Sequence, residues 1–156
     1  MEYKTSTWTK LLHLVAWIIL LSGVFFALIV PYFIPELLDF YLSEFNSDIL
    51  FESISKGPKT MIQFLFGLIG GIMIGWGILL IIITRQLFIK DEPWIWRAIT
   101  ISAIGWFLFD SVLSIALGSF FNVIFNLVFL DLVMLPIVGY NYSNWKTSKN
   151  KNSVSM

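Results

Sequence analysis

The chain alternates long apolar runs with short polar ones. Four of the runs are almost free of charge and lie near residues 11–30, 61–84, 94–117 and 120–139. A helix needs about 20 apolar residues to cross roughly 30 Å of hydrocarbon, and each run meets that length. The pattern therefore predicts an all-α fold, an integral membrane four-helix bundle formed by one transmembrane domain of residues 1–145.

The connections between the runs contain helix start and stop signals. In the sequence DEPW, Asp91 or Glu92 can cap a helix that has Pro93 in its first turn, where the missing N–H of proline is not needed. Only Gly118 and Ser119 separate the third run from the fourth. This short separation predicts a tight antiparallel hairpin.

Two further segments lie outside the spans. Between the first and second runs, the sequence PELLDFYL has leucines and a tyrosine at helical spacing after Pro35, with Glu36 and Asp39 on the other face. It predicts a short amphipathic helix in the first outer loop, on the membrane surface or over the end of the bundle. Residues 146–156 are polar and are predicted to form a disordered tail.

The distribution of basic residues predicts the orientation. Four spans put both termini and the loop between the second and third spans on one side of the membrane. Only Lys56 and Lys59 fall on the other side. By the positive-inside rule, this predicts a multi-pass protein of the cell (inner) membrane with both termini in the cytoplasm. The basic residues on the terminal side are Lys4, Lys10, Arg85, Lys90, Arg97, Lys146, Lys149 and Lys151.

Composition narrows the classes of function. The 156 residues are 58% hydrophobic and 13% charged, with a mean hydropathy of +0.83, whereas soluble domains are about 45–50% apolar and about 25% charged. The net charge of +0 gives no overall basic field that would recruit nucleic acid. Cysteine is absent and His13 is the only histidine, which excludes thiolate catalysis, cysteine-ligated metals and a multi-histidine metal site within one chain.

Glycines are frequent in the second run, although glycine costs about 1 kcal/mol relative to alanine in a water-exposed helix interior. Gly67, Gly71 and Gly75 are spaced to share one helix face, and Gly70 and Gly77 make a second strip. In lipid, small residues let helix backbones approach for van der Waals contact. We therefore expect these glycines to pack against neighbouring helices of the bundle. A dimer interface and room for a flat ligand are the alternatives.

Polar side chains in the third and fourth runs predict a cluster in the outer half of the membrane. Residues equidistant from the turn of a hairpin lie at similar depth, which brings Asp110 close to Asn126. Polar groups at this depth are either hydrogen-bonded between helices or part of a functional site. Both interpretations stay open, a structural network and a ligand-binding site. The candidate residues are Asp110, Ser111, Ser114, Asn122 and Asn126, with Gln63 of the second run as a further member.

The other intramembrane carboxyl, Asp131, lies near mid-membrane and shortly before Pro136, which removes a helix hydrogen bond and can kink the span. A proton relay between Asp131 and His13 is a weaker hypothesis, because the two residues differ in depth. A Ser-His-Asp triad is excluded, since His13 lies toward the cytoplasmic side and the serines beside Asp110 lie in the outer half.

The second to fourth runs resemble the small four-helix bacterial membrane proteins known as DoxX-like proteins and related domains of unknown function. The resemblance rests on the glycine-rich GGIMIGWG, the short basic loop after it and the sequence WFLFDSVLSIALGSFFNVIFNLVFLDLVMLP, and it covers about residues 10–140. The segment PELLDFYL is also similar to its counterpart in those proteins. Some DoxX-type proteins are associated with quinol oxidases or membrane redox complexes. No metal- or haem-ligand motif is present, so the resemblance carries over no catalytic residue.

These observations favour a non-enzymatic protein that binds a lipid, a quinone-like or another small amphipathic molecule, or that supports a membrane complex. The expected partners are membrane lipid and another membrane protein or a second copy of the chain, and no cofactor is specified. An integral membrane enzyme of the lipid isomerase type, with Asp110 as acid or base, is one alternative. A small proton-coupled transporter that uses Asp131 is the other.

Overall fold

The computed structural model describes residues 7–45, 47–90 and 92–154, so Lys4 and Asp91 lie outside the described residues. These residues are almost entirely helical. In chain order the elements are α1 (Thr7–Val24), the π-helical turn η1 (Phe25–Ile29), α2 (Val30–Phe33), α3 (Pro35–Leu42), the 3-10 turn η2 (Phe51–Ser53), α4 (Lys56–Ile89), α5 (Pro93–Leu117) and α6 (Phe120–Val154).

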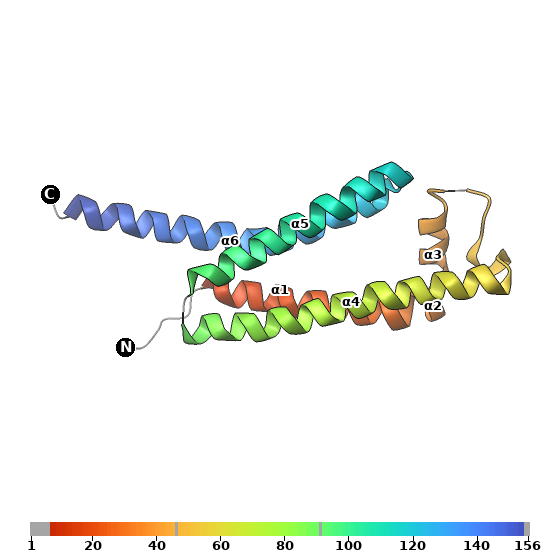
Figure 1. The fold of residues 1–156 in the computed structure, drawn as a ribbon, viewed down its shortest axis with the longest axis horizontal. Helices are drawn as coiled ribbons and strands as arrows, with labels where there is room; N and C mark the ends of the chain where they lie inside the picture. The colour runs from red at the N-terminus through yellow and green to blue at the C-terminus, as the bar shows by residue number, and fades with distance from the viewer. Residues whose placement is uncertain (1–6, 46, 91, 155–156) are drawn as a thin grey trace.

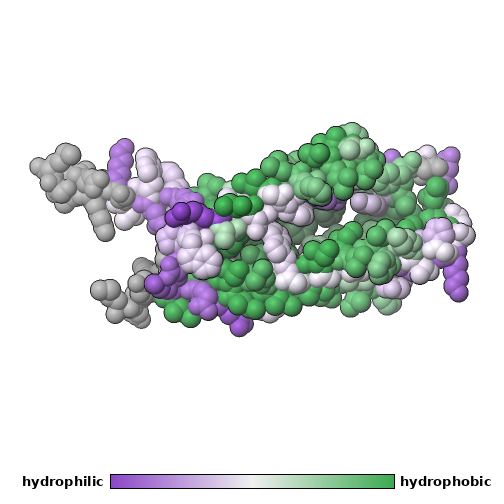
Figure 2. Space-filling view, in the orientation of Figure 1, coloured by the Kyte–Doolittle hydropathy of each residue, from purple (hydrophilic) through white to green (hydrophobic). Residues whose placement is uncertain are grey.

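Four helical stretches are long and apolar enough to cross a membrane. They are Thr7–Phe33, Lys56–Ile89, Pro93–Leu117 and Phe120–Thr147. In Figure 2 the middle of the molecule is covered by hydrophobic residues, and the hydrophilic residues gather at the two ends. The prediction of an all-α fold is confirmed, and its four long helices have the length and composition of membrane spans.

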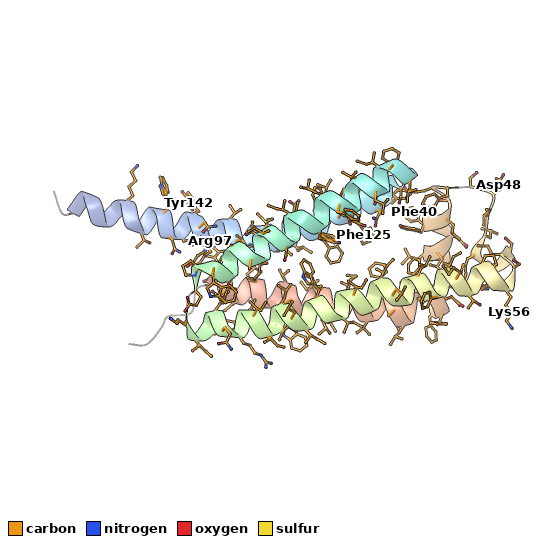
Figure 3. All side chains as sticks on the ribbon, in the orientation of Figure 1. Phe40, Asp48, Lys56, Arg97, Phe125 and Tyr142 are labelled. Atoms are coloured by element: carbon orange, nitrogen blue, oxygen red, sulfur yellow. The ribbon has the colours of Figure 1, made fainter. Side chains whose placement is uncertain are left out.

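The spans pair as two hairpins. α1 packs along α4, α5 packs along α6, and α1 also contacts α6. In Figure 1 one end of the molecule holds both chain ends and the α4–α5 connection, and we call it the terminal end. The other end holds α3 and the α5–α6 turn, and we call it the loop end. In Figure 3 Arg97 and Tyr142 mark the terminal end, and Asp48 and Lys56 mark the loop end.

The main apolar core joins the two hairpins in the half toward the terminal end. It includes the fully buried Leu12 and Ile19 of α1, Leu80 of α4, Ile99 of α5 and Val133 of α6. A smaller core at the loop end is formed by Val30, Leu38 and Phe51, with the Asp39 carboxylate accepting the Phe51 backbone N–H. Burial of Leu38 explains why PELLDFYL is helical as predicted: it packs its apolar face onto the end of the bundle.

Only one of the two predicted glycine strips packs inside the chain. A Cβ atom on Gly77 would lie 2.7 Å from Leu20 Cβ of α1, and one on Gly70 would lie 2.6 Å from Ala27 Cβ of η1. By contrast, a Cβ on Gly67, Gly71 or Gly75 would meet nothing within 4 Å. The expectation that these last three pack within the bundle is therefore wrong, because α1 lies on the other face of α4.

The predicted hairpin turn is confirmed. Gly118 has a left-handed φ of 82°, and the backbone N–H of Ser119 donates to the carbonyl of Ser114 at 2.8 Å. This is the geometry with which glycine ends a helix. At the other end, α5 begins at Pro93 as predicted, but the Glu92 side chain does not cap the helix and pairs instead with Lys90 at 2.6 Å.

Two boundaries differ from the predictions. The first span extends to Phe33 through η1. At the end of η1 the Val30 N–H bonds to the Phe25 carbonyl, a π-helical bond directly before Pro31, which has no N–H to donate. The tail predicted to be disordered is helical as far as Val154. Once α6 has formed, each added residue extends an existing helix, and Thr147 Oγ1 donates to the carbonyl of Ser143 at 3.0 Å.

Candidate functional site

The predicted polar cluster forms at the interface of α5 and α6. Asn122 Nδ2 donates to Asp110 Oδ2 at 3.0 Å, and Asn126 Nδ2 donates to the same oxygen at 2.6 Å. Asn122 also reaches Ser114 Oγ at 2.7 Å, and Asn126 reaches Ser111 Oγ at 3.3 Å. One carboxyl oxygen thus joins two successive turns of the neighbouring helix.

Three donor groups of the cluster find acceptors within it, namely the two asparagine side-chain amides and the Ser114 hydroxyl. Asn126, Ser111 and Ser114 are buried, and the Ser114 hydroxyl donates to the Asp110 carbonyl at 2.7 Å. Among the described residues, every buried side-chain nitrogen and oxygen has a hydrogen-bond partner. Such a network holds two helices together in lipid, where bonds of this kind contribute on average about 0.6 kcal/mol each. This geometry favours the structural interpretation of the cluster over an open ligand site.

Gln63 does not join these residues. Its Nε2 donates to the backbone carbonyl of Pro31 at 3.2 Å, which ties α4 to α2. In a regular helix the Pro31 carbonyl would accept from residue 35, but Pro35 has no N–H, and the side-chain amide of Gln63 satisfies this carbonyl instead. The expectation that Gln63 belongs to the Asp110 cluster is therefore not met.

Glu44 links the loop end of the two hairpins, and sequence reasoning missed it. Ser119 Oγ donates to Glu44 Oε2 at 2.8 Å, and the Phe121 backbone N–H donates to Glu44 Oε1 at 2.7 Å. The Phe40 and Phe121 rings also meet, with centroids 4.3 Å apart. A carboxylate is favourable at a helix N-terminus because the free N–H groups there carry partial positive charge. The first turns of α1, α4 and α5 also lack an acidic residue, so no feature of the sequence singles out α6 for this contact.

His13 is fully engaged by α1 and α4. Trp17 Nε1 donates to His13 Nε2 at 3.3 Å, and His13 Nδ1 lies 2.7 Å from Thr84 Oγ1. The Thr84 hydroxyl in turn donates to the Leu80 carbonyl at 2.7 Å. Because an indole N–H can only donate, Nε2 is an acceptor and Nδ1–H completes the set by donating to Thr84. No ring nitrogen is left for the proton relay to Asp131, and the structure does not bring the two residues together.

Asp131 lies on the outer face of α6, away from the rest of the bundle. It is exposed, as are Val128 and Leu135 on the same face, whereas Val133 and Ile137 are buried. Within the part of the chain that the structure describes, Asp131 has no hydrogen-bond or ion-pair partner. The same part of the chain contains no group of three or more His, Asp or Glu side chains that could hold a metal ion.

Comparison of the chain with protein-family models, with curated proteins and with solved structures finds no match. The resemblance to DoxX-like proteins therefore stays a prediction.

Proposed function

We propose that the protein is a non-enzymatic component of a membrane complex and binds a transmembrane helix of a partner protein through Asp131. The observation that carries the proposal is a carboxyl on the lipid-facing side of α6 with no partner among the described residues. The four helices that are long and apolar enough to cross a membrane support a position of this carboxyl within the bilayer.

The depth of Asp131 makes its exposure costly. It follows Phe120, the first residue of α6, by 11 residues, which places it about 16 Å along the helix and close to the middle of a core about 30 Å thick. An Asp at the centre of a spanning helix is unfavourable by about 2.5–3.5 kcal/mol on insertion scales. The side chain is too short to reach the headgroups, so relief must come from a group at the same depth.

The chemistry of the partner follows from charge complementarity. A carboxyl in hydrocarbon is satisfied best by a cationic donor, and a charge-assisted hydrogen bond is roughly twice as strong as a neutral one. The faces beside Asp131 are apolar, with Val128 and Leu135 more than half exposed at 53% and 57%. We therefore infer a partner helix that is apolar except for a Lys or Arg side chain at mid-depth.

The geometry gives less support to the catalytic and transport alternatives. The Asp110 carboxyl is held by two asparagine amides, and no second acid or base is among its hydrogen-bond partners, so an isomerase lacks its proton-transfer pair. A proton-coupled transporter needs a relay from Asp131, and His13 is occupied by Thr84 and Trp17.

The proposed setting is the inner membrane of a bacterial cell, with the terminal end in the cytoplasm. The excess of basic residues at that end supports this orientation. In this orientation Asp110 and Asn126 lie in the outer half of the bilayer, and the two loop-side lysines, Lys56 and Lys59, face outward.

The test uses the full chain in phosphatidylcholine liposomes with a synthetic polyleucine transmembrane peptide that carries one central arginine. Association is measured by energy transfer between dyes on the protein and the peptide. We expect transfer with the arginine peptide and only the random background with an all-leucine peptide. Asp131→Leu should remove the specific energy transfer. Asp110→Asn is the control, because this intramembrane carboxyl is already paired within the chain, and it should leave the energy transfer unchanged.

Two results would overturn the proposal. One is equal binding of the leucine and arginine peptides, which would make the contact a matter of apolar packing alone. The other is strong energy transfer between two labelled copies of the protein that Asp131→Leu abolishes, because the occupant of this face would then be a second copy of the chain.

A further inference from the structure

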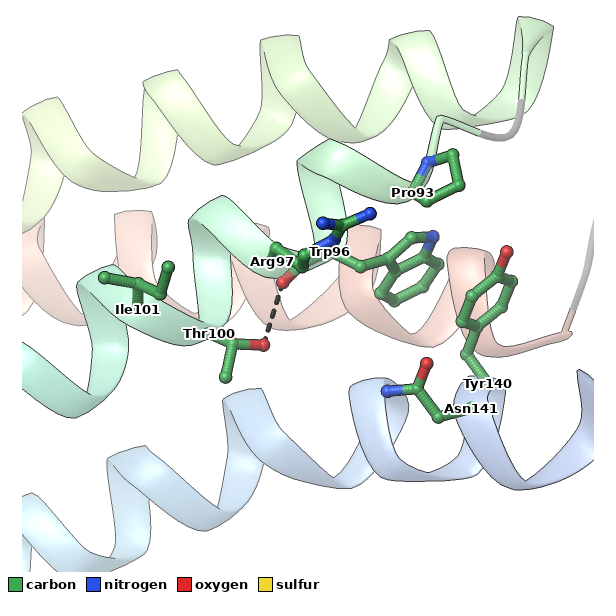
Figure 4. A pocket seen from close by; sticks show the side chains of 7 residues that line it. All are labelled: Pro93, Trp96, Arg97, Thr100, Ile101, Tyr140 and Asn141. Atoms are coloured by element: carbon green, nitrogen blue, oxygen red, sulfur yellow. Dashed lines mark hydrogen bonds between the residues drawn. The ribbon is translucent and has the colours of Figure 1, made fainter. Parts of the chain in front are cut away.

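A second exposed polar group, the guanidinium of Arg97, lies at a groove at the terminal end and is independent of Asp131. The groove has a volume of about 440 Å³ and runs between the first turns of α5 and the middle of α6. Figure 4 shows its lining side chains: Pro93, Trp96, Arg97, Thr100, Ile101, Tyr140 and Asn141.

The floor of the groove is rigid and aromatic. The rings of Trp96 and Tyr140 stack with centroids 4.2 Å apart and an interplanar angle of 12°. Both side chains are buried, at 3% and 8% exposure. The Thr100 hydroxyl donates to the Trp96 carbonyl at 2.8 Å, as the dashed line in Figure 4 shows. This hydroxyl proton is therefore committed to the helix, and the side chains of Arg97 and Asn141 carry further donors at the lining of the groove.

The charge of the groove is positive and uncompensated. Arg97 has no ion pair within residues 7–45, 47–90 and 92–154, and no Asp or Glu lines the groove. The nearby Glu92 is paired with Lys90 at 2.6 Å. A guanidinium offers a planar fork of donors that matches the oxygens of a phosphate. The groove is therefore complementary to an anion.

The axis of the groove matches the axis of a phospholipid. Pro93, Arg97 and Ile101 are each one turn apart on α5, which separates them by about 6 Å in depth. Pro93 begins the helix, Arg97 lies one turn further in, and Ile101 is 72% exposed another turn toward the middle of the span. A phosphate at Arg97 would therefore have apolar surface directly below it for an acyl chain.

We propose that this groove is a binding site for an anionic phospholipid, with the lipid phosphate on Arg97 and Asn141 and one acyl chain along Ile101. The stacked Trp96 and Tyr140 rings, the floor of the groove, would lie at the level of the glycerol backbone. Basic pockets between transmembrane helices on the cytoplasmic side of a membrane are the kind of site that selects anionic headgroups.

The experiment is native mass spectrometry of the full chain released from nanodiscs that contain equal amounts of phosphatidylglycerol and phosphatidylcholine. We expect the parent protein to retain phosphatidylglycerol about tenfold over phosphatidylcholine, because both headgroups offer a phosphate to Arg97 but only phosphatidylcholine carries a choline cation that the arginine repels. Arg97→Gln should reduce the preference to near one. Arg97→Lys should keep part of it, because charge is retained and the fork is lost.

Arg85→Gln is the matched control. Arg85 is an exposed cation on α4 at the same end of the bundle and does not line the groove. If Arg85→Gln lowers the preference as much as Arg97→Gln, the selection is a property of the basic surface and the site is refuted. A third arm adds inorganic phosphate to nanodiscs of phosphatidylcholine alone, and an Arg97-dependent phosphate adduct there would show a site for the free ion instead of a lipid.

Discussion

The two neighbouring glycines Gly70 and Gly71 are expected to respond in opposite directions to the same substitution. Gly70→Ala would place a Cβ 2.6 Å from the Cβ and from the backbone N of Ala27. Neither atom can rotate away, so α4 and η1 must separate, and overpacking of this kind costs about 1–3 kcal/mol. Because the clash is with fixed atoms, we expect a loss near 2–3 kcal/mol.

Gly71→Ala introduces its Cβ into open space, with nothing within 4 Å. Its main effect is then the helix preference of alanine over glycine, worth up to about 1 kcal/mol. The two variants thus differ by about 3 kcal/mol in the free energy of unfolding, or roughly a hundredfold in the folding equilibrium constant. The chemical change and the depth in the membrane are nearly identical in the two cases.

The assay is reversible unfolding in mixed micelles with increasing sodium dodecyl sulfate, with a linear extrapolation as used for other denaturants. Near-ultraviolet circular dichroism reports the packing of the Trp76–Trp106 and Trp96–Tyr140 pairs. A neutral Gly70→Ala would refute the close approach of the first and second spans. An equally destabilising Gly71→Ala would show that this face is covered in the folded protein.

Two further substitutions test one polar contact between the hairpins and one within the α5–α6 hairpin. Glu44→Gln should lower the free energy of unfolding by about 1–2 kcal/mol in the same detergent assay, because the carboxylate leaves the N-terminus of α6. Glu36→Gln is the control: Glu36 is exposed in the first turn of α3, and its loss should stay below about 1 kcal/mol. Asn126→Leu should cost about 0.6–1.7 kcal/mol by removing the shorter of the two amide bonds to Asp110. In a double-mutant cycle with Asp110→Ala the two losses should not add, and additive losses would exclude the hydrogen bond as their source.

Much of the fold is predictable because the forces that decide it are local to the sequence. The lengths of the apolar runs define the spans, and the Gly118-Ser119 separation requires the α5–α6 turn. The same turn fixes the relative depth of Asp110 and Asn126, so a network between them follows from counting residues on two antiparallel helices.

The remaining contacts depend on how the hairpins pack against one another. Periodicity places Gly67, Gly71 and Gly75 on one face of α4, but it does not say that α1 packs on the other face. In the same way, Gln63 meets the Pro31 carbonyl because α2 lies beside α4. The pairing of Glu44 with α6 joins positions far apart in sequence and has no signature in the loop itself. The helical continuation to Val154 was missed because composition describes an isolated segment, and this one grows from an existing helix.

The contact between Glu44 and the start of α6 also has a meaning for synthesis of the protein. The loop that contains Glu44 leaves the ribosome long before its binding partners, the hydroxyl of Ser119 and the N–H of Phe121. The hairpin of α5 and α6 must be inserted before that carboxylate has anything to bind. Formation of the Glu44 contact is therefore a late event of biogenesis, because it has to wait for the start of α6.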